Sequence, residues 1–267
     1  MAINVEGPLT LSCVVDGENS RGTRRYNLNG DNAGDNFEAA YAALLAAVPA
    51  DTPWGSSVYP FTWMFPQRAT LERLRPDSAR ATVEFAAVGA APGDGTFGVK
   101  FRFDTGSLSF ATDKDAAGNA LPPVNQVGRL SRQTAMVQLP ALTFTLERCE
   151  PATGWARNST TGGASVSGLQ RDRVAAILGH VNSSNFMGYS GGNREWFFTG
   201  VNVQQWEYDE DYVRVAYHFA HALFELSPSF RPGWKVLCQD GNYYDVYPTA
   251  DFGILGLRWP DGTLISS

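Results

Sequence analysis

Short runs in which apolar and polar residues alternate recur along most of the chain, and they constrain its fold more than any other feature. A period of two is that of a β-strand with one face buried. Turn sequences such as Asp94-Gly95 and Asp104-Thr105-Gly106 separate several of the runs. The pattern predicts a mainly β, β-rich α+β protein built of antiparallel sheets in a sandwich-like arrangement. The runs occupy residues 9–15, 81–88, 97–103, 108–112, 142–149, 195–203, 212–226, 243–247 and 252–259.

One or two helices interrupt this pattern. Residues 36–48 place apolar side chains on a single stripe at helical spacing, and Pro49 ends the stripe. Asp35 is the predicted N-cap, with Glu38 three residues later. Residues 169–178 predict a second, shorter helix.

Composition suggests how the chain divides. Residues 151–168 are rich in Gly, Ser, Thr and Ala, which is typical of a linker or surface loop. We therefore predict a β-rich domain over residues 1–150 and a β-rich C-terminal part over 169–267, with one continuous domain as the alternative. Residues 49–76 combine several prolines with aromatic side chains, which predicts an extended arm instead of a long regular element.

Charge and cysteine usage exclude several classes of function. The 21 basic and 27 acidic residues give a net charge of −6, which argues against a nucleic-acid partner, because neutralising phosphates requires a basic face. The best apolar run, residues 39–48, is far shorter than the roughly 18 residues of a membrane span, and the start resembles no secretory signal. Three cysteines without a Cys-x-x-Cys spacing predict reduced thiols, no zinc site and synthesis in a cytoplasm. We expect no cofactor and no membrane partner.

The segment Phe103-Asp104-Thr105-Gly106-Ser107 resembles the active-site signature of aspartic peptidases, in which two aspartates share a proton and activate a water. No second Asp-Thr-Gly or Asp-Ser-Gly occurs, so only a homodimer could assemble the pair. The element Ile254-Leu255-Gly256 resembles another part of retroviral peptidases, but it lies too far from Asp104 for their compact fold. The favoured interpretation of this segment is a hairpin turn.

Two further motifs have a structural interpretation that we favour. The segment Gly188-Tyr189-Ser190-Gly191-Gly192 matches the Gly-x-Ser-x-Gly nucleophile elbow, but an elbow opens a helix and a strand follows here. His218 and His221 would share a metal only on a helix, and the alternation around them predicts a strand with the two side chains on opposite faces. We therefore predict no catalytic and no metal-binding residue.

Three segments carry a resemblance to structural proteins of tailed bacteriophages or prophages. They are Asn185-Phe186-Met187-Gly188-Tyr189, Phe197-Phe198-Thr199-Gly200 and the strand pattern of residues 212–219. The resemblance covers about a third of the chain. It implies a virion protein of the neck, tail or capsid, made in the cytoplasm of a bacterial host, that contacts copies of itself and other virion proteins. The excess of Arg over Lys, 18 to 3, agrees with a GC-rich bacterial or phage genome.

The sequence thus predicts a non-enzymatic assembly protein that acts as a homo-oligomer. Exposed aromatic patches often mark partner surfaces, so the expected interface lies in the proline-rich arm. One alternative is a homodimeric aspartic peptidase using Asp104. The other is a carbohydrate-binding module, because the faces of tryptophan rings stack on sugars and the chain has seven tryptophans. The expected interface residues are Trp54, Tyr59, Phe61, Trp63 and Phe65.

Overall fold

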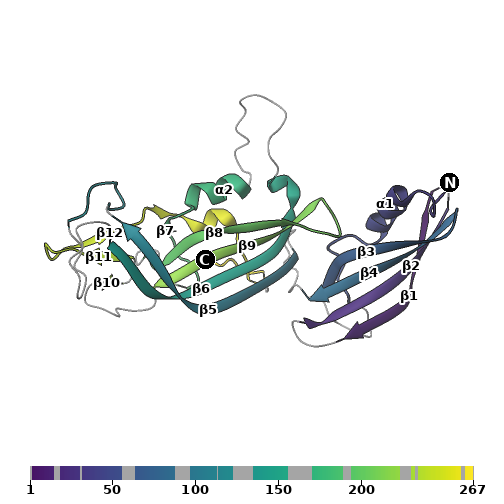
Figure 1. The fold of residues 1–267 in the computed structure, drawn as a ribbon, viewed down its shortest axis with the longest axis horizontal. Helices are drawn as coiled ribbons and strands as arrows, with labels where there is room; N and C mark the ends of the chain where they lie inside the picture. Colours follow the sequence, from purple (N-terminus) through teal and green to yellow (C-terminus); the bar gives the residue numbers. More distant parts are fainter. Residues whose placement is uncertain are drawn as a thin grey trace, which may run out of the picture.

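The computed structural model shows an elongated molecule with two β-sheets placed end to end (Figure 1). The prediction of a mainly β, β-rich α+β fold is confirmed. None of the helices in the described ranges is long and apolar enough to cross a membrane. The structure describes residues 2–14, 19–30, 32–55, 64–87, 97–112, 114–122, 135–155, 170–188, 194–222, 230–231, 234–259 and 262–266.

The first sheet is antiparallel and has the strand order β1-β2-β4-β3. Helix α1 (Phe37–Ala47) packs on one of its faces and closes a core that includes Tyr26, Leu28, Leu44 and Phe85. Every second residue of β4 faces this core, as its alternating pattern predicts. The strands are β1 (Asn4–Val14), β2 (Arg21–Asn29), β3 (Met64–Arg75) and β4 (Ser78–Ala87).

Helix α1 confirms the first predicted helix but begins one residue later than expected. Asn36 is the N-cap, and its side-chain oxygen accepts a hydrogen bond from the Ala39 amide at 3.0 Å. Asp35, the predicted cap, instead forms an ion pair with Arg73 of β3 at 2.7 Å. Both residues can cap a helix, and the ion pair to the sheet selects between them.

Strand β3 corrects the prediction of an irregular arm over residues 49–76. Residues 64–75 form a regular strand at one edge of the sheet, and Pro66 lies where the register with β4 shifts. Proline has no N–H to donate, so an edge strand and a bulge are the places where a sheet accepts it. Pro66 is therefore compatible with a regular strand here, because β3 lies at an edge of the sheet.

The second sheet has six strands in the order β13-β7-β8-β9-β6-β5. Helix α2 (Gln170–Ile177), which confirms the second predicted helix, and the 3-10 helix η4 (Phe252–Leu255) contribute to the core on one face. Residues 252–259 were predicted as a strand, but the Asp251 side chain accepts from the Gly253 amide and starts η4 instead. The strands are β5 (Phe97–Thr112), β6 (Ala135–Pro151), β7 (Val181–Asn182), β8 (Trp196–Gln205), β9 (Tyr212–Ala222) and β13 (Thr249–Ala250), and η2 (Ala152–Gly154) follows β6.

A third, small sheet packs near the far end of the second one. It consists of β10 (Phe230–Arg231), β11 (Lys235–Leu237) and β12 (Tyr243–Asp245). Trp234 and Val236 form a separate buried cluster with Val181 and Ala220 of the large sheet.

The two large sheets divide the chain at a different place from the predicted linker. Residues 141–151 of β6 pair with β9, for example Thr145 with His218, so residues on both sides of the predicted linker form one sheet. The change of sheet falls between β4 and β5. Most of the predicted linker lies outside the described residues. Strand pairing over such a sequence distance leaves no mark in local composition.

Candidate functional site at the junction of the two sheets

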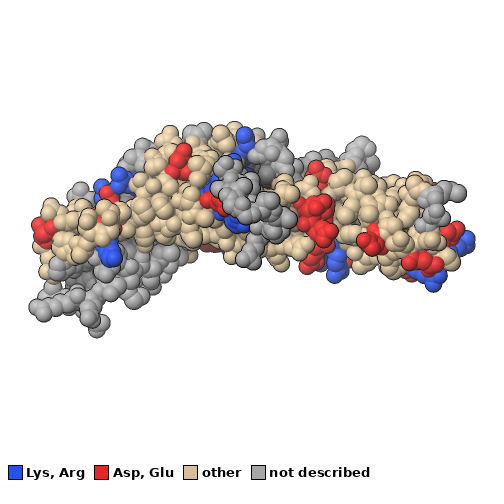
Figure 2. Space-filling view, turned by 90° about the horizontal axis from the view of Figure 1, so that it is seen from above, with Lys and Arg blue, Asp and Glu red and all other residues tan. Residues whose placement is uncertain are grey.

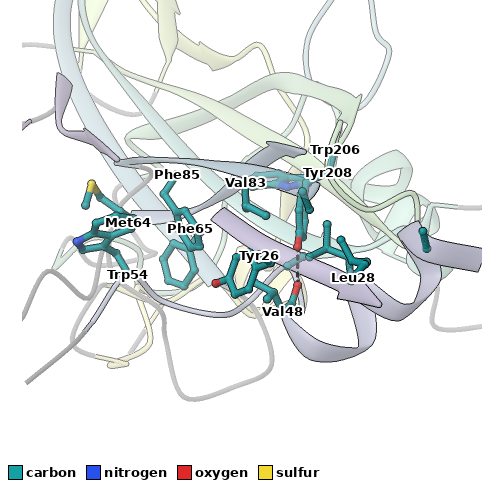
Figure 3. Close-up of a cluster of buried hydrophobic side chains, with 14 of the residues drawn as sticks. Tyr26, Leu28, Val48, Trp54, Met64, Phe65, Val83, Phe85, Trp206 and Tyr208 are labelled. Carbon is teal, nitrogen blue, oxygen red and sulfur yellow. Dashed lines mark hydrogen bonds between the residues drawn. The ribbon is translucent and has the colours of Figure 1, made fainter. Parts of the chain in front are cut away.

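The hairpin between β8 and β9 extends beyond its own sheet and enters the core of the first one (Figure 3). Trp206 and Tyr208 are both buried there. The Trp206 indole donates to the Pro66 carbonyl at 2.9 Å, and the Tyr208 hydroxyl donates to the Val48 carbonyl at 2.7 Å. The hydroxyl of Tyr41 on α1 donates in turn to the Tyr208 carbonyl. The hairpin therefore joins the two sheets through apolar packing and satisfied polar groups.

A short acidic loop supports these two aromatic side chains. The Asp209 side chain accepts from the Asp211 amide at 3.0 Å, and the Trp206 amide donates to the Tyr212 carbonyl, which closes the hairpin. Glu207, Asp209, Glu210 and Asp211 make the loop strongly negative. Figure 2 shows a group of acidic side chains at the middle of the molecule, where this hairpin meets the first sheet.

Arg214 of β9 is the central polar residue of the junction. Its guanidinium donates to the Gln67 side-chain oxygen on β3 at 2.7 Å and lies over the Trp206 ring, 5.0 Å from the ring centre. Cation–π stacking and a charge-assisted hydrogen bond together restrict the orientation of the guanidinium plane. Arg214 is therefore held in place from both sheets.

Two cavities share Gln67 and Arg214 in their walls. The larger, here called the junction cavity, has a volume of about 220 Å³, and the smaller has about 190 Å³. The smaller one is lined by Gln204, Gln205, Trp206 and Glu207 together with the shared pair. The junction cavity is lined by Gln67, Ala86, Ala87, Lys100, Glu147, Cys149 and Arg214.

The second sheet contributes most of the polar groups of the junction cavity. Lys100 pairs with Glu147 across β5 and β6, and Cys149 pairs with Arg214 across β6 and β9, which places all four side chains on the sheet face away from α2. Burial raises the pKa of the Cys149 thiol strongly, and the nearby Arg214 charge offsets only part of this. The thiol therefore stays protonated near neutral pH, and it contributes a small neutral surface to the cavity.

The same sheet face continues away from the cavity as a polar surface. His218 Nδ1 lies 3.1 Å from the Thr145 hydroxyl, and its Nε2 lies 3.2 Å from the Asn202 amide nitrogen. Burial lowers the pKa of His218, Arg102 adds to this, and Glu147 opposes it. A neutral His218 can accept from the Asn202 amide, and this row of side chains then spans three strands.

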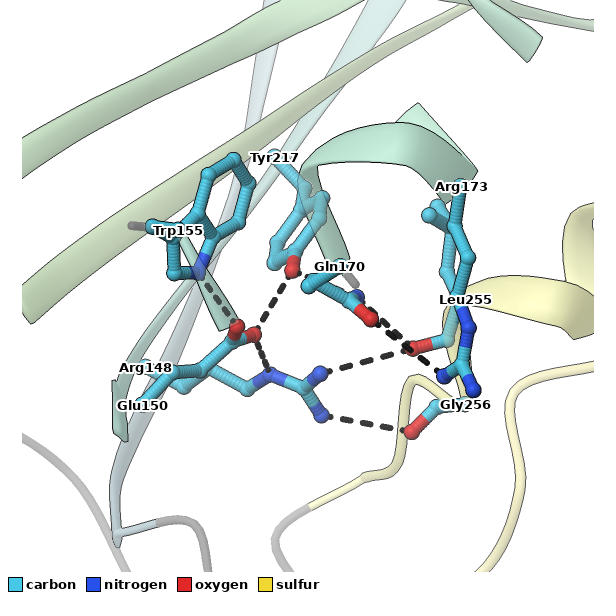
Figure 4. Close-up of polar contacts among 8 residues, drawn as sticks. All are labelled: Arg148, Glu150, Trp155, Gln170, Arg173, Tyr217, Leu255 and Gly256. Carbon is cyan, nitrogen blue, oxygen red and sulfur yellow. Dashed lines mark hydrogen bonds and ion pairs between the residues drawn. The ribbon is translucent and has the colours of Figure 1, made fainter. Parts of the chain in front are cut away.

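A second polar cluster lies on the opposite face of this sheet (Figure 4). The Arg148 guanidinium and the Glu150 carboxylate form a buried ion pair at 2.5 Å, with both side chains 6% exposed. The Tyr217 hydroxyl and the Trp155 indole donate to the same carboxylate at 2.6 and 2.8 Å. Burial disfavours the charged guanidinium, but Glu150 and Tyr217 together more than compensate, so the pKa of Arg148 lies above its ordinary value.

The Arg148 cluster ties the C-terminal region to the sheet. Arg148 donates to the carbonyls of Leu255 and Gly256, and the Gln170 amide donates to the Leu255 carbonyl and to the Tyr217 hydroxyl. Buried charges are tolerated when such partners satisfy them. Because these contacts attach η4 and α2 to the sheet, we interpret the cluster as structural.

The predicted interface residues lie in two different settings. Trp54 and Phe65 are 1% and 0% exposed, and both belong to the core of the first sheet. Trp54 packs over Gly22 and Arg24, with the Arg24 guanidinium 4.7 Å from its ring centre. The expectation of an exposed aromatic surface is therefore wrong for these two positions. Tyr59, Phe61 and Trp63 lie outside the described residues.

Asp104 is in the middle of a continuous strand, which corrects the predicted hairpin turn. Strand β5 passes through Asp104 and Gly106 and pairs them with Thr143 and Ala141 of β6. The Asp104 carboxylate forms an ion pair with Arg102 at 2.6 Å. Pairing with β6 overrode the local turn tendency of this segment. The arrangement gives no support to an Asp104 peptidase.

The remaining motifs are also placed by the structure. His218 and His221 face opposite sides of β9, as predicted, and His221 lies 3.2 Å from Glu195. Among the described residues no three potential metal ligands come together. Ser190 lies outside the described ranges. The tryptophans that are described are buried or half-buried, so the predicted sugar-stacking surface finds no support among Trp54, Trp155, Trp196, Trp206, Trp234 and Trp259.

Five of the exposed large apolar side chains lie on two strands at sheet edges, where the sequence did not predict them, and the others are spread over α1, β3, β8, η4 and loops. Leu9, Leu11 and Val14 of β1 are 52%, 50% and 55% exposed, and Phe101 and Phe103 of β5 are 42% and 41% exposed. The alternation in these runs signals strands but does not show which strand ends a sheet.

No family model, no curated protein and no solved structure matches this chain.

Proposed function

We propose that this chain is a non-enzymatic structural subunit that assembles with copies of itself through its edge strands. The observation that carries the proposal is the exposure of large apolar side chains on β1 and β5. Each of these strands ends its sheet. Edge strands with exposed apolar residues are templates for pairing with another chain, and proteins that stay monomeric usually block them with charges or bulges.

The two edges differ in how well they are protected. The first half of β1 contains a register shift between Glu6 and Thr10, which interrupts regular pairing there. Residues 10–14 pair regularly with β2 and contain Leu11 and Val14. On β5, the Phe101 ring packs edge-on against the Phe103 and Trp259 rings. The three rings form a small aromatic cluster next to this edge strand. These two segments are the contacts that we propose.

The positions of the edges support an extended assembly. In the view of Figure 1, β1 and β5 lie along the lower margins of their sheets, whereas α1 and α2 lie along the upper margin. One neighbouring surface could therefore engage both edges. Two weak contacts that act together bind far more tightly than either alone.

We also propose that the assembly is part of a phage particle, in its neck, tail or capsid. This step rests on the resemblance of residues 185–189, 197–200 and 212–219 to phage structural proteins. Mass spectrometry of purified particles from a bacterium that carries the gene tests it. Peptides of this chain at a stoichiometry similar to known particle proteins would support the proposal, and their absence from intact particles would contradict it.

The assembly itself is tested by sedimentation of the purified chain and two edge variants. Leu11→Lys and Phe103→Lys each place a charge on an edge strand, and we expect both to shift the oligomer toward the monomer. Leu178→Lys is the matched control, because Leu178 is 53% exposed and lies outside the strands. A monomeric parent chain at all concentrations, or equal effects of the three variants, would refute the role of the edges.

A further inference from the structure

A cavity of about 350 Å³ lies on the face of the first sheet that points away from α1, and we call it the open-face cavity. It is larger than the two cavities at the junction, and it shares Gln67 and Ala86 with the junction cavity. Its volume is within the range of about 300–1,000 Å³ that is typical of small-molecule sites. The residues of its walls that matter here are Ser12, Val14, Arg21, Thr23, Glu84 and Ala86.

Strand register explains why these residues come together. Val14 pairs with Arg21, and Arg21 pairs with Ala86, so the three lie in one row across β1, β2 and β4. Phe85 belongs to the core under α1, so its neighbour Ala86 faces the other way. The next row, two positions along each strand and on the same face, consists of Ser12, Thr23 and Glu84.

The open-face cavity offers more apolar surface than its surroundings. Its walls are mostly apolar, whereas the walls of the two junction cavities are mostly polar. Val14 is 55% exposed and Ala86 is half-buried, although β4 presents Arg80 and Thr82 on the same face further along. A largely apolar wall with a few polar groups is the usual lining of a small-molecule site.

Arg21 provides a positive charge beside this apolar surface. Glu84, the acidic residue of the walls, is already paired with Arg68 at 2.9 Å. In the part of the chain that the structure describes, no carboxylate pairs with Arg21, and its side chain is exposed. A guanidinium has five N–H donors in a planar fork that matches the two oxygens of a carboxylate. The open-face cavity therefore combines apolar walls with one cation that can bind an anion.

We propose that the open-face cavity binds a small amphiphilic carboxylate, with its apolar part on Val14 and Ala86 and its carboxylate on Arg21. The hydroxyl groups of Ser12 and Thr23, in the neighbouring row, can add hydrogen bonds to the carboxylate oxygens. The ligand is a free small molecule, and its binding does not depend on assembly through the edge strands.

The test uses the full chain, labelled with carbon-13 in the methyl groups of valine and alanine, and titrated with octanoate. The readouts are the NMR signals of the Val14 and Ala86 methyl groups, which line the cavity. We expect saturable shifts with octanoate. Acetate, which lacks the apolar chain, and octylamine, which has the opposite charge, should both bind more weakly. Raising the salt concentration should weaken the binding of octanoate.

A charge reversal separates a binding site from a general effect on folding. Arg21→Gln should weaken octanoate binding severalfold, as expected for an exposed charge pair. Arg21→Glu should reverse the preference, so that octylamine binds better than octanoate, which no loss of folding can imitate. Arg25→Glu is the matched control and should keep the preference for octanoate, because Arg25 lies on the same face of β2 but outside the cavity walls. The amide spectrum of each variant shows whether the fold is kept.

Several outcomes would overturn the proposal. They are the absence of a saturable shift with octanoate through the millimolar range, equal binding of octylamine or acetate by the parent chain, and a reversed preference in Arg25→Glu. Shifts of the same methyl signals that appear on concentrating the protein alone, and that octanoate leaves unchanged, would assign the cavity to a second copy and would also overturn it. Sedimentation of the edge variants measures assembly separately.

Discussion

The Arg214 guanidinium and the Gln67 side chain form a hydrogen bond of 2.7 Å between β9 and β3, across the junction of the two sheets. The residues are 147 positions apart in the chain. The bond lies beside the buried Trp206 and Tyr208 side chains, which reach the first sheet from the same hairpin. We therefore expect the hairpin to couple the two sheets into one cooperative unit.

We expect Trp206→Ala to lower the free energy of unfolding by about 3–5 kcal/mol, because it empties a buried position and removes the hydrogen bond to Pro66. It should also split a single calorimetric transition into two, since the hairpin loses a buried contact with the core of the first sheet. Differential scanning calorimetry measures both effects. Glu207→Gln, at the exposed neighbouring position, is the control. One unsplit transition in Trp206→Ala would show that other contacts couple the sheets.

The Arg148 and Glu150 ion pair should be strongly non-additive. Glu150→Leu leaves a buried guanidinium without its counter-charge and is expected to cost about 3–5 kcal/mol. The double variant Arg148→Met with Glu150→Leu removes both charges and should cost much less than the sum of the single changes. Urea unfolding of the four proteins provides the cycle. Additive costs would mean that the pair does not act as a unit.

His218 predicts a specific dependence of stability on pH. Burial lowers its folded-state pKa below the ordinary value of 6.5, so the unfolded chain binds the proton more tightly. The free energy of unfolding should therefore fall as the pH drops through 6.5 and should level off below the folded pKa. His218→Gln should flatten this part of the curve, measured by urea unfolding between about pH 8 and about pH 5. His180→Gln serves as the control, and an identical flattening there would exclude His218 as the cause.

Gly34 should tolerate no side chain. A Cβ at this position would lie 1.8 Å from the Arg75 carbonyl oxygen, which is backbone and cannot rotate away. Gly34→Ala is therefore expected to lower the free energy of unfolding by more than about 3 kcal/mol. Gly55→Ala is the matched control, since a Cβ there meets nothing within 4 Å. Equal melting temperatures for the two variants would contradict the close approach.

Local patterns predicted several elements of the fold. The alternation around Val83 and Phe85 indicated a strand with one buried face, and the apolar stripe of residues 36–48 indicated a helix. These elements follow from periodicity because each needs only a nearby apolar surface to cover one face. The same reasoning placed His218 and His221 on opposite faces of a strand, and the structure agrees.

Long-range pairing decided the rest. Asp104-Thr105-Gly106 has the composition of a turn, but β6 offers a partner along its whole length and the strand continues. Trp54 is predicted from the sequence to be an interface residue, but its ring is buried in the core beside Gly22. A Cβ at position 22 would lie 2.7 Å from this ring, so glycine leaves the space that the ring needs.

The sequence by itself determined the class of the fold and several of its strands, because the period of the pattern is a local property. Only the tertiary structure decided which strands end the sheets, where the two sheets meet, and that Arg214, Lys100 and Glu147 share a cavity. These relations depend on contacts between residues far apart in the chain, and such contacts leave no periodic trace in it.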